Sequence, residues 1–109
     1  MQKYKVILFE QGNQKPIEAF IYSLSKQTFA KILRLLDCLE NYGPQLGMPH
    51  TKRITSRIYE LRIKTPESVR LLYWPVGDKI FILHGFKKKK QKIPNKEIEI
   101  AEKRMMNLF

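Results

Sequence analysis

The sequence has very little of the two residue types from which small proteins most often build cross-links and metal sites. Of its 109 residues, one is cysteine, Cys38, and two are histidine. A single cysteine excludes a disulfide within the chain, and neither residue type recurs at the spacing of metal ligands. We therefore expect a cytoplasmic protein with no disulfide, no metal and no other cofactor.

Long apolar runs are also missing. No stretch approaches the roughly 20 apolar residues of a membrane-spanning helix. The opening residues, MQKYKVILFEQGN, lack the long apolar core and the cleavage site of a signal peptide. Hydrophobic residues still make up 43% of the sequence, which suffices for one compact core in a chain too short for two. The composition indicates a soluble protein with a single domain over residues 1–109.

Acidic residues are the third shortage. The chain has 10 Asp and Glu against 21 Lys and Arg, a formal net charge of +11. Residues 1–49 hold six basic and four acidic side chains, whereas residues 50–109 hold fifteen and six, so the excess lies in the second half. Such a field attracts a polyanion, which is most commonly nucleic acid, with an anionic membrane or an acidic protein as alternatives.

Apolar spacing and turn residues predict an α+β fold with the element order β-α-α-β-β-β-α. Helical stripes at 17–24, after Pro16, and at 29–39, before the stop signal Gly43-Pro44, form an expected helical hairpin. Strands are expected over 4–10, 57–64, 69–74 and 79–86, a loop over 43–56, and a last helix from Pro94. The helical stripes are expected to pack against the sheet.

Two arginines are expected to become neighbours on one face of this sheet. In the strand 57–64, RIYELRIK, apolar and charged residues alternate, which is typical of a half-buried strand. If Arg62 lies opposite Arg70 of the next strand, their side chains share the polar face. Because two like charges side by side are unfavourable, an anion bound between them is a natural explanation.

The next strand leads into a run of lysines. If its turn places Arg70 opposite His84, then His84 and Phe86 join the arginine face, whereas a slip of one residue buries His84 in the core. Four consecutive lysines, 87–90, follow Phe86 and precede the expected helix at Pro94. Regular elements on both sides therefore hold the lysines in place, although such a run is often only a solvated face.

Three motifs are similar to those of a known family. They are YELR at Tyr59–Arg62, VRLLYW at Val69–Trp74, and ILHGFKKKKQKIPNKEIEIAEKR at Ile82–Arg104. They resemble the phage-derived, HigB-like branch of the RelE/ParE superfamily of toxins. The resemblance implies a small twisted antiparallel sheet packed against an N-terminal helical hairpin and a C-terminal helix. It also implies a ribosome-dependent, metal-independent endoribonuclease acting on messenger RNA, and an antitoxin partner, often of the helix-turn-helix type.

The same resemblance assigns catalytic positions. It implies that Arg62 and Arg70 bind the scissile phosphate, whose developing charge suits the fork of a guanidinium. Lys52 resembles an upstream catalytic lysine, and Lys87 and Lys88 follow in the lysine run. One of these lysines, with its pKa lowered in a cationic patch, or His84 is a candidate acid or base. The further candidates for RNA contact are His50, Arg53, Arg57, Trp74, Phe86, Lys89, Lys90 and Lys92.

The sequence departs from the family pattern at Lys90 and Ile93, where a hydroxyl residue is frequent. Without that hydroxyl as a cap, the start of the last helix stays open. Each candidate also has a structural alternative: His84, Trp74 and Phe86 can be core residues, and Arg62 can pair with Glu60 or Glu67 at the surface. The alternative functions are a non-catalytic nucleic-acid-binding protein using the same face, and an adaptor for acidic proteins.

Overall fold

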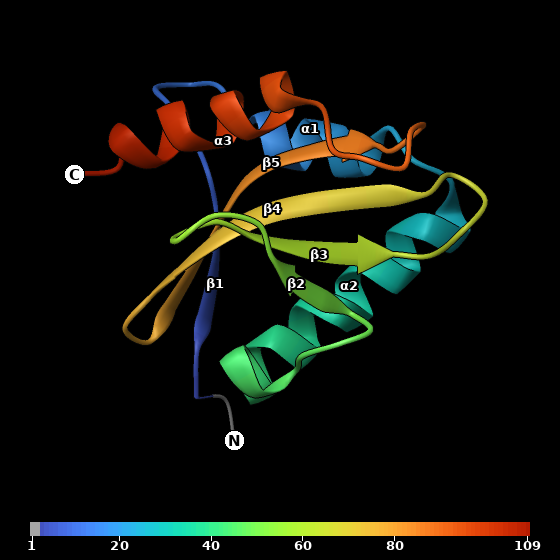
Figure 1. Cartoon of the computed structure of the whole chain (residues 1–109), viewed down its shortest axis with the longest axis horizontal. Coiled ribbons are helices and arrows are strands. Elements are labelled where there is room, and N and C mark those ends of the chain that lie inside the picture. Colours follow the sequence, from blue (N-terminus) through green and yellow to red (C-terminus); the bar gives the residue numbers. More distant parts are fainter. Residues whose placement is uncertain (1–2) are drawn as a thin grey trace.

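A computed structural model of the chain describes residues 3–109. A five-stranded sheet lies at its centre, with helices on both faces (Figure 1). The strands are β1 (Lys5–Leu8), β2 (Thr51–Arg53), β3 (Tyr59–Ile63), β4 (Val69–Val76) and β5 (Lys79–Lys87). The helices are α1 (Pro16–Tyr22), α2 (Lys26–Tyr42) and α3 (Asn95–Met106), with a short 3-10 turn over Gly43–Gln45. The α+β class expected from the sequence is confirmed.

The sheet is mixed, and the expectation of an antiparallel sheet was wrong for one of its strands. The strand order is β1-β5-β4-β3-β2, and β1 runs parallel to β5, whereas the other pairs are antiparallel. The long connection through α1, α2, β2, β3 and β4 brings the chain back to the side of β1, which permits parallel pairing. The spacing of apolar residues within β1 carries no information about its direction.

A short strand also occupies part of the segment expected to be a loop. β2 pairs with β3, with Thr51 opposite Leu61 and Lys52 opposite Glu60. Thr51 is buried, while Lys52 and Arg53 are exposed. A three-residue strand with one inward side chain is too short to show alternation, and the flanking glycines and prolines predict a loop. β2 forms because β3 supplies the hydrogen-bond partners.

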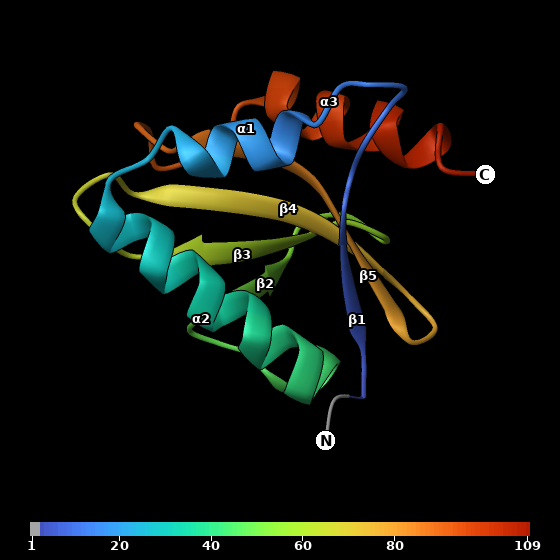
Figure 2. The same ribbon diagram turned by 180° about the vertical axis from the view of Figure 1, so that it is seen from behind.

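Helices cover the sheet in two layers. Figure 2 shows α1 and α2 on one face, with α3 behind on the other. Ser25 caps α2, because its hydroxyl oxygen accepts a hydrogen bond from the Thr28 amide at 3.2 Å. The core side chains of these helices include Ile17, Ile21, Ile32 and Leu39, as their spacing predicts. The α3 stripe contributes Ala101 and Met105 from the opposite side.

β5 is an interior strand of the sheet. Ile80, Phe81, Ile82 and Leu83 are all buried, because helices cover both faces of the strand and β1 and β4 flank it. Among residues 3–109, no helix combines the length and the apolarity that a membrane crossing requires.

Candidate nucleic-acid interface

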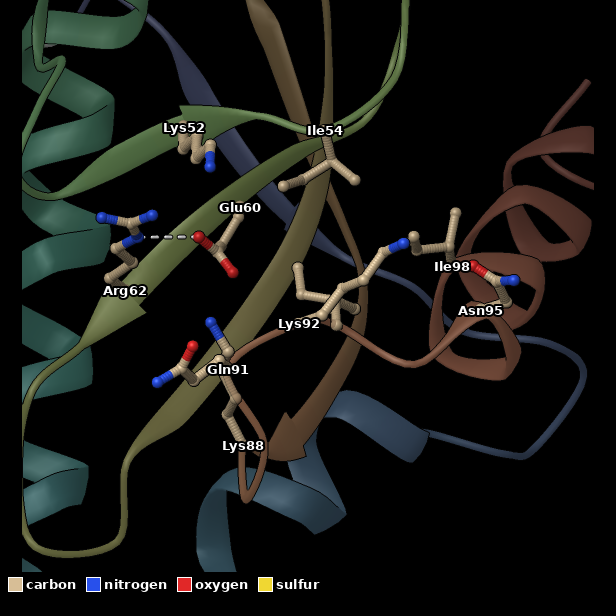
Figure 3. Close-up of a pocket in the computed structure, with 10 residues that line it drawn as sticks. Lys52, Ile54, Glu60, Arg62, Lys88, Gln91, Lys92, Asn95 and Ile98 are labelled. Carbon is tan, nitrogen blue, oxygen red and sulfur yellow. Dashed lines mark hydrogen bonds and ion pairs between the residues drawn. The ribbon is translucent and has the colours of Figure 1, made fainter.

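An open cleft of about 470 Å³ lies between the β2–β3 edge of the sheet and the lysine-rich loop that follows β5 (Figure 3). Lys52 and Arg62 reach it from the two strands, and Lys88 and Gln91 reach it from the loop on the other side. The full lining is Lys52, Ile54, Glu60, Arg62, Lys88, Gln91, Lys92, Ile93, Asn95 and Ile98. Four cationic side chains thus surround a single carboxylate.

That carboxylate, Glu60, is the anion between the two arginines. Arg62 and Arg70 lie directly opposite each other, as expected from the sequence. Arg62 Nε donates to Glu60 Oε1 at 2.7 Å, and Arg70 Nε lies 3.5 Å from Oε2. The Glu60 side chain has no exposed surface. The pair between Arg62 and Glu60, raised from the sequence as a surface pair, is therefore buried on the Glu60 side. The sheet supplies its own anion, and no bound ligand is needed to explain why the arginines adjoin.

Arg70 is less exposed than Arg62. Its side chain is 11% exposed and does not line the cleft. Arg70 Nη1 donates to the carbonyl of Val69 at 3.0 Å. Burial lowers the pKa of Arg70, the Glu60 carboxylate opposes this shift, and the Arg62 charge adds to it. The side chain lies where it balances Glu60.

The lysines divide into those that face the cleft and those that do not. Lys88 lines the cleft, and its amide donates to the Ser68 carbonyl at 2.8 Å, which fixes the start of the loop. Lys87 is outside the lining and pairs with Glu67 at 3.3 Å. Lys92 also lines the cleft, and with Lys90 it borders a smaller depression beside it. Lys89 is exposed.

His84 lies on the arginine face, although its register differs from the expected one. It is opposite Leu72, while Phe86 is opposite Arg70. Near the turn Tyr73 pairs with Ile82, and a bulge at Leu72/Tyr73 shifts the pairing on the side away from the turn by one residue. His84 Nε2 lies 2.8 Å from Glu97 Oε1 of α3, and Nδ1 lies 3.4 Å from Arg104 Nη1.

These two contacts tie His84 to α3 and leave it outside the cleft lining. Burial lowers the pKa of His84, against the opposing effect of Glu97. Because Arg104 can only donate, Nδ1 accepts and Nε2 carries the proton donated to Glu97. This geometry suits a structural histidine better than the acid or base expected from the sequence.

The two aromatic residues expected to stack on bases lie elsewhere. Phe86 is 6% exposed, and its ring stacks on His84 with centroids 5.7 Å apart. Trp74 packs against Phe81 and Phe109, with ring centroids 6.3 and 6.0 Å apart. It lies near the end of β4 that is distant from Arg70. This packing favours core roles for both residues over the stacking roles expected from the sequence, because α3 and the chain end lie against this part of the polar face.

The remaining candidates lie around the cleft without lining it. The His50 carbonyl accepts a hydrogen bond from the Arg62 amide at 2.8 Å, so His50 continues the pairing of β2 with β3. Arg53 donates to the carbonyls of Thr55 and Ser56, at 3.1 Å each, and thereby braces the β2–β3 turn. Arg57 is exposed in that turn.

Six cleft residues carry no positive charge and are not indicated by the sequence patterns. Glu60, Gln91 and Asn95 line the cleft together with the apolar residues Ile54, Ile93 and Ile98. The alternation of β3 does place Glu60 beside Arg62, and Leu72 on the neighbouring strand indicates that this face is partly apolar. Within residues 3–109, no three His, Cys, Asp or Glu side chains gather as metal ligands.

Comparison with known proteins adds one match. Residues 19–106 fit the model of a family described as Phage derived protein Gp49-like (DUF891). This match covers the second half of α1, all of α2, the strands β2–β5 and α3, and so includes every residue of the cleft. No curated protein shows a significant match to the chain.

Proposed function

Because the chain belongs to the phage-derived Gp49-like family, a RelE/ParE-like toxin family of toxin–antitoxin systems, we propose that it is a ribosome-dependent endoribonuclease. It cleaves messenger RNA and arrests translation, as in the HigB-like branch that its motifs resemble. The observation that carries the proposal is the cleft, where Lys52, Arg62 and Lys88 converge on one open volume of about 470 Å³. The family by itself is associated with ribonuclease toxins.

The cleft residues fit the needs of RNA cleavage by an internal nucleophile. The ribose 2′-hydroxyl attacks the adjacent phosphorus, the bond to the 5′-oxygen breaks, and a cyclic phosphate forms. Arg62 binds the phosphate oxygens and stabilises their added charge in the transition state. Lys52 and Lys88, on opposite sides of the cleft, serve as the base for the 2′-hydroxyl and the acid for the leaving oxygen.

Dependence on the ribosome follows from what the cleft lacks. Its described lining offers no aromatic side chain on which a base can stack. An open, cationic cleft binds phosphate but does not fix the geometry of attack, which must come from elsewhere. The ribosome supplies that geometry by holding the messenger RNA, so the protein alone cuts free RNA poorly.

A neutralising antitoxin is the second part of the proposal. The positive half of the chain favours a partner with acidic groups, of the helix-turn-helix type that the resemblance implies. A groove of about 330 Å³ on the helical hairpin offers another contact region, with Tyr22 68% and Leu33 51% exposed. Co-purification with the product of the neighbouring gene tests this partner, and separate elution of the two proteins contradicts it.

The alternative is a nucleic-acid-binding protein that uses the same cations without cutting. Induction of the chain in growing bacteria, with mapping of messenger-RNA ends, separates the two functions. We expect growth arrest and new ends within translated regions. Purified ribosomes with a defined messenger RNA then give the cleavage rate, and the alternative predicts binding without new ends.

Lys52→Ala is the first variant to test, because Lys52 is exposed and lines the cleft. Removal of a group that transfers a proton is expected to slow cleavage by about 10²- to 10⁴-fold. Lys79→Ala is the matched control, an exposed lysine at the far end of β5. Equal cleavage by the Lys52→Ala protein and the control would rule out the proposed role of Lys52.

A further inference from the structure

Glu60 is an unusual residue for its position. Its side chain has no exposed surface and lies opposite the fully buried Leu72. A buried carboxylate is unfavourable unless it is paired, and an apolar residue of similar size often stabilises such a position better. Packing therefore does not explain why this position holds a carboxylate. The positive charges of Arg62 and Arg70 beside it do explain it.

The contacts made by Glu60 determine which part of Arg62 remains available. Glu60 Oε1 accepts from Nε of Arg62, at 2.7 Å, and not from the terminal nitrogens. In the part of the chain that the structure describes, no residue forms a hydrogen bond with those terminal nitrogens. The Arg62 side chain is 19% exposed and lines the cleft, so its outer edge is open to a ligand. Two parallel N–H groups on that edge match two oxygens of a phosphate.

The second oxygen of Glu60 connects this arrangement to Arg70. Oε2 lies 3.5 Å from Arg70 Nε, and both atoms are buried without a hydrogen-bond partner among the described residues. The carboxylate therefore lies between two guanidinium groups that would otherwise repel each other across the strand pair. A buried, charged cluster of this kind has few alternative arrangements, because any rotation of Glu60 leaves an uncompensated charge.

We propose that Glu60 is a positioning residue that holds Arg62 by Nε and presents its terminal nitrogens to an RNA phosphate in the cleft. Glu60 touches neither substrate nor reacting atoms and acts only through Arg62. The inference rests on the proposed function for its catalytic consequence. The orientation of Arg62 toward a phosphate can be measured without cleavage.

Glu60→Gln tests this role, because glutamine keeps the size and one oxygen acceptor but removes the charge. The matched control is Glu99→Gln, at an exposed position of α3, which makes the same change in net charge. At saturating messenger-RNA-loaded ribosomes, we expect Glu60→Gln to lower the cleavage rate by roughly a hundredfold, because small misplacements of a catalytic group have effects of that order. The affinity for the ribosome complex should stay within threefold of the control.

The second measurement uses an uncleavable 2′-O-methyl RNA dinucleotide and nuclear magnetic resonance of the arginine side chains. In the parent chain, the Arg62 Nε–H signal should be protected from solvent exchange and should shift when the dinucleotide binds. In Glu60→Gln, protection should fall at least tenfold and the shift should be smaller, while Glu99→Gln should behave like the parent.

The outcomes separate this inference from the proposed function. If the parent chain does not cleave on ribosomes but Arg62 responds to the dinucleotide only when Glu60 is present, the proposed function is wrong and the positioning role stands. An equal response in Glu60→Gln overturns the positioning role, as does the absence of any response of Arg62 in the parent chain. A parallel loss of rate, affinity and folded fraction would show that Glu60 has only a structural role.

Discussion

Arg70 lies beside the cleft with its guanidinium directed at a fully buried carboxylate. The resemblance to the toxin family implies that Arg70 contacts phosphate directly. The position of Arg70 on the polar face of the sheet predicts that it contributes little to stability. Its burial and its pairing with Glu60 favour a different role. Arg70 completes the charge balance of a buried cluster. Under the proposed function, it would affect RNA only through Glu60 and Arg62.

Arg70→Ala is therefore expected to destabilise the fold. Removal of one partner leaves Glu60 buried with a single counter-charge, and the loss should be about 2–4 kcal/mol in the free energy of unfolding. Chemical denaturation measures it, with Arg57→Ala as the control, because Arg57 is exposed and should change stability by less than about 0.5 kcal/mol. Equal stability of the two variants would show that the pair contributes little.

At the scale of elements, one glycine determines how closely α1 approaches the sheet. Gly85 lies in β5 between His84 and Phe86, where a side chain would face the first helix. A β-carbon at this position would lie 2.5 Å from Cδ2 of Phe20 and 2.8 Å from Cδ2 of Leu71. Both distances are too short, so Phe20 packs directly on the backbone of β5 and the interruption of this apolar strand by glycine has a steric cause.

Gly85→Ala should accordingly lower the free energy of unfolding by about 1–3 kcal/mol through overpacking. Phe20→Ala has its own cost but removes the nearer of the two close contacts, and it leaves space into which the end of the Leu71 side chain can turn. In the double variant the two costs should be less than additive, by at least about 0.5 kcal/mol. Strict additivity of the two substitutions, measured by denaturation, would contradict the proposed clash.

Glu67 connects the start of α2 to the turn before β4 and to the lysine run. Glu67 Oε1 accepts hydrogen bonds from the amide of Ser25 at 3.0 Å and from its hydroxyl at 2.8 Å. The hydroxyls of Thr28 and Ser25 lower the pKa of Glu67 from 4.5 to about 2. A carboxyl group whose pKa is lowered in the folded state stabilises the fold above its ordinary pKa, and this stabilisation disappears as the pH falls toward the folded value.

The stability contributed by Glu67 should therefore be complete above about pH 4.5 and should be lost between pH 4.5 and about 2. Glu67→Gln is expected to lower the unfolding temperature at pH 6, with a smaller difference from the parent at pH 3. Thermal unfolding followed by circular dichroism at both pH values measures this. Glu99→Gln, at an exposed position, is the control, and a difference independent of pH would assign the effect to packing.

For the whole molecule, most of the positive charge belongs to the part of the chain that forms the cleft. The cleft lies in the half of the chain that carries fifteen of the 21 basic residues. Lys88 of the lysine run lines the cleft, and so does Lys92, which comes after the run. Lys87 does not line the cleft and is paired with Glu67. The net charge attracts a polyanion from any direction, and the cleft determines where its phosphates can be held.

Binding to a single-stranded RNA should weaken steeply with salt, since each neutralised phosphate releases a counterion. Lys88→Ala and Lys92→Ala should each reduce the slope of log affinity against log salt by about 0.7. Lys87→Ala and the distant Lys79→Ala should change it much less. Four equal slopes would show that the lysines act only through net charge.

Local features of the sequence suffice to predict the α+β class, the helices after Pro16 and before Gly43, the facing of Arg62 and Arg70, and the positive charge of the second half. These features depend on periodicity, turn residues and composition, which are local properties of the chain. The family resemblance also came from local motifs, and the match over residues 19–106 supports its broader part.

Four other features emerge only in the folded chain: the direction of β1, the existence of β2, the bulge that shifts His84, and the burial of Glu60. Each of these depends on which residues, distant in sequence, lie side by side. On an isolated strand, Glu60 would be an exposed charge. In the folded sheet, it is the buried counterion of Arg62 and Arg70. Alternation shows that Glu60 shares a face with Arg62, but what covers that face is fixed by long-range packing, which no local pattern encodes.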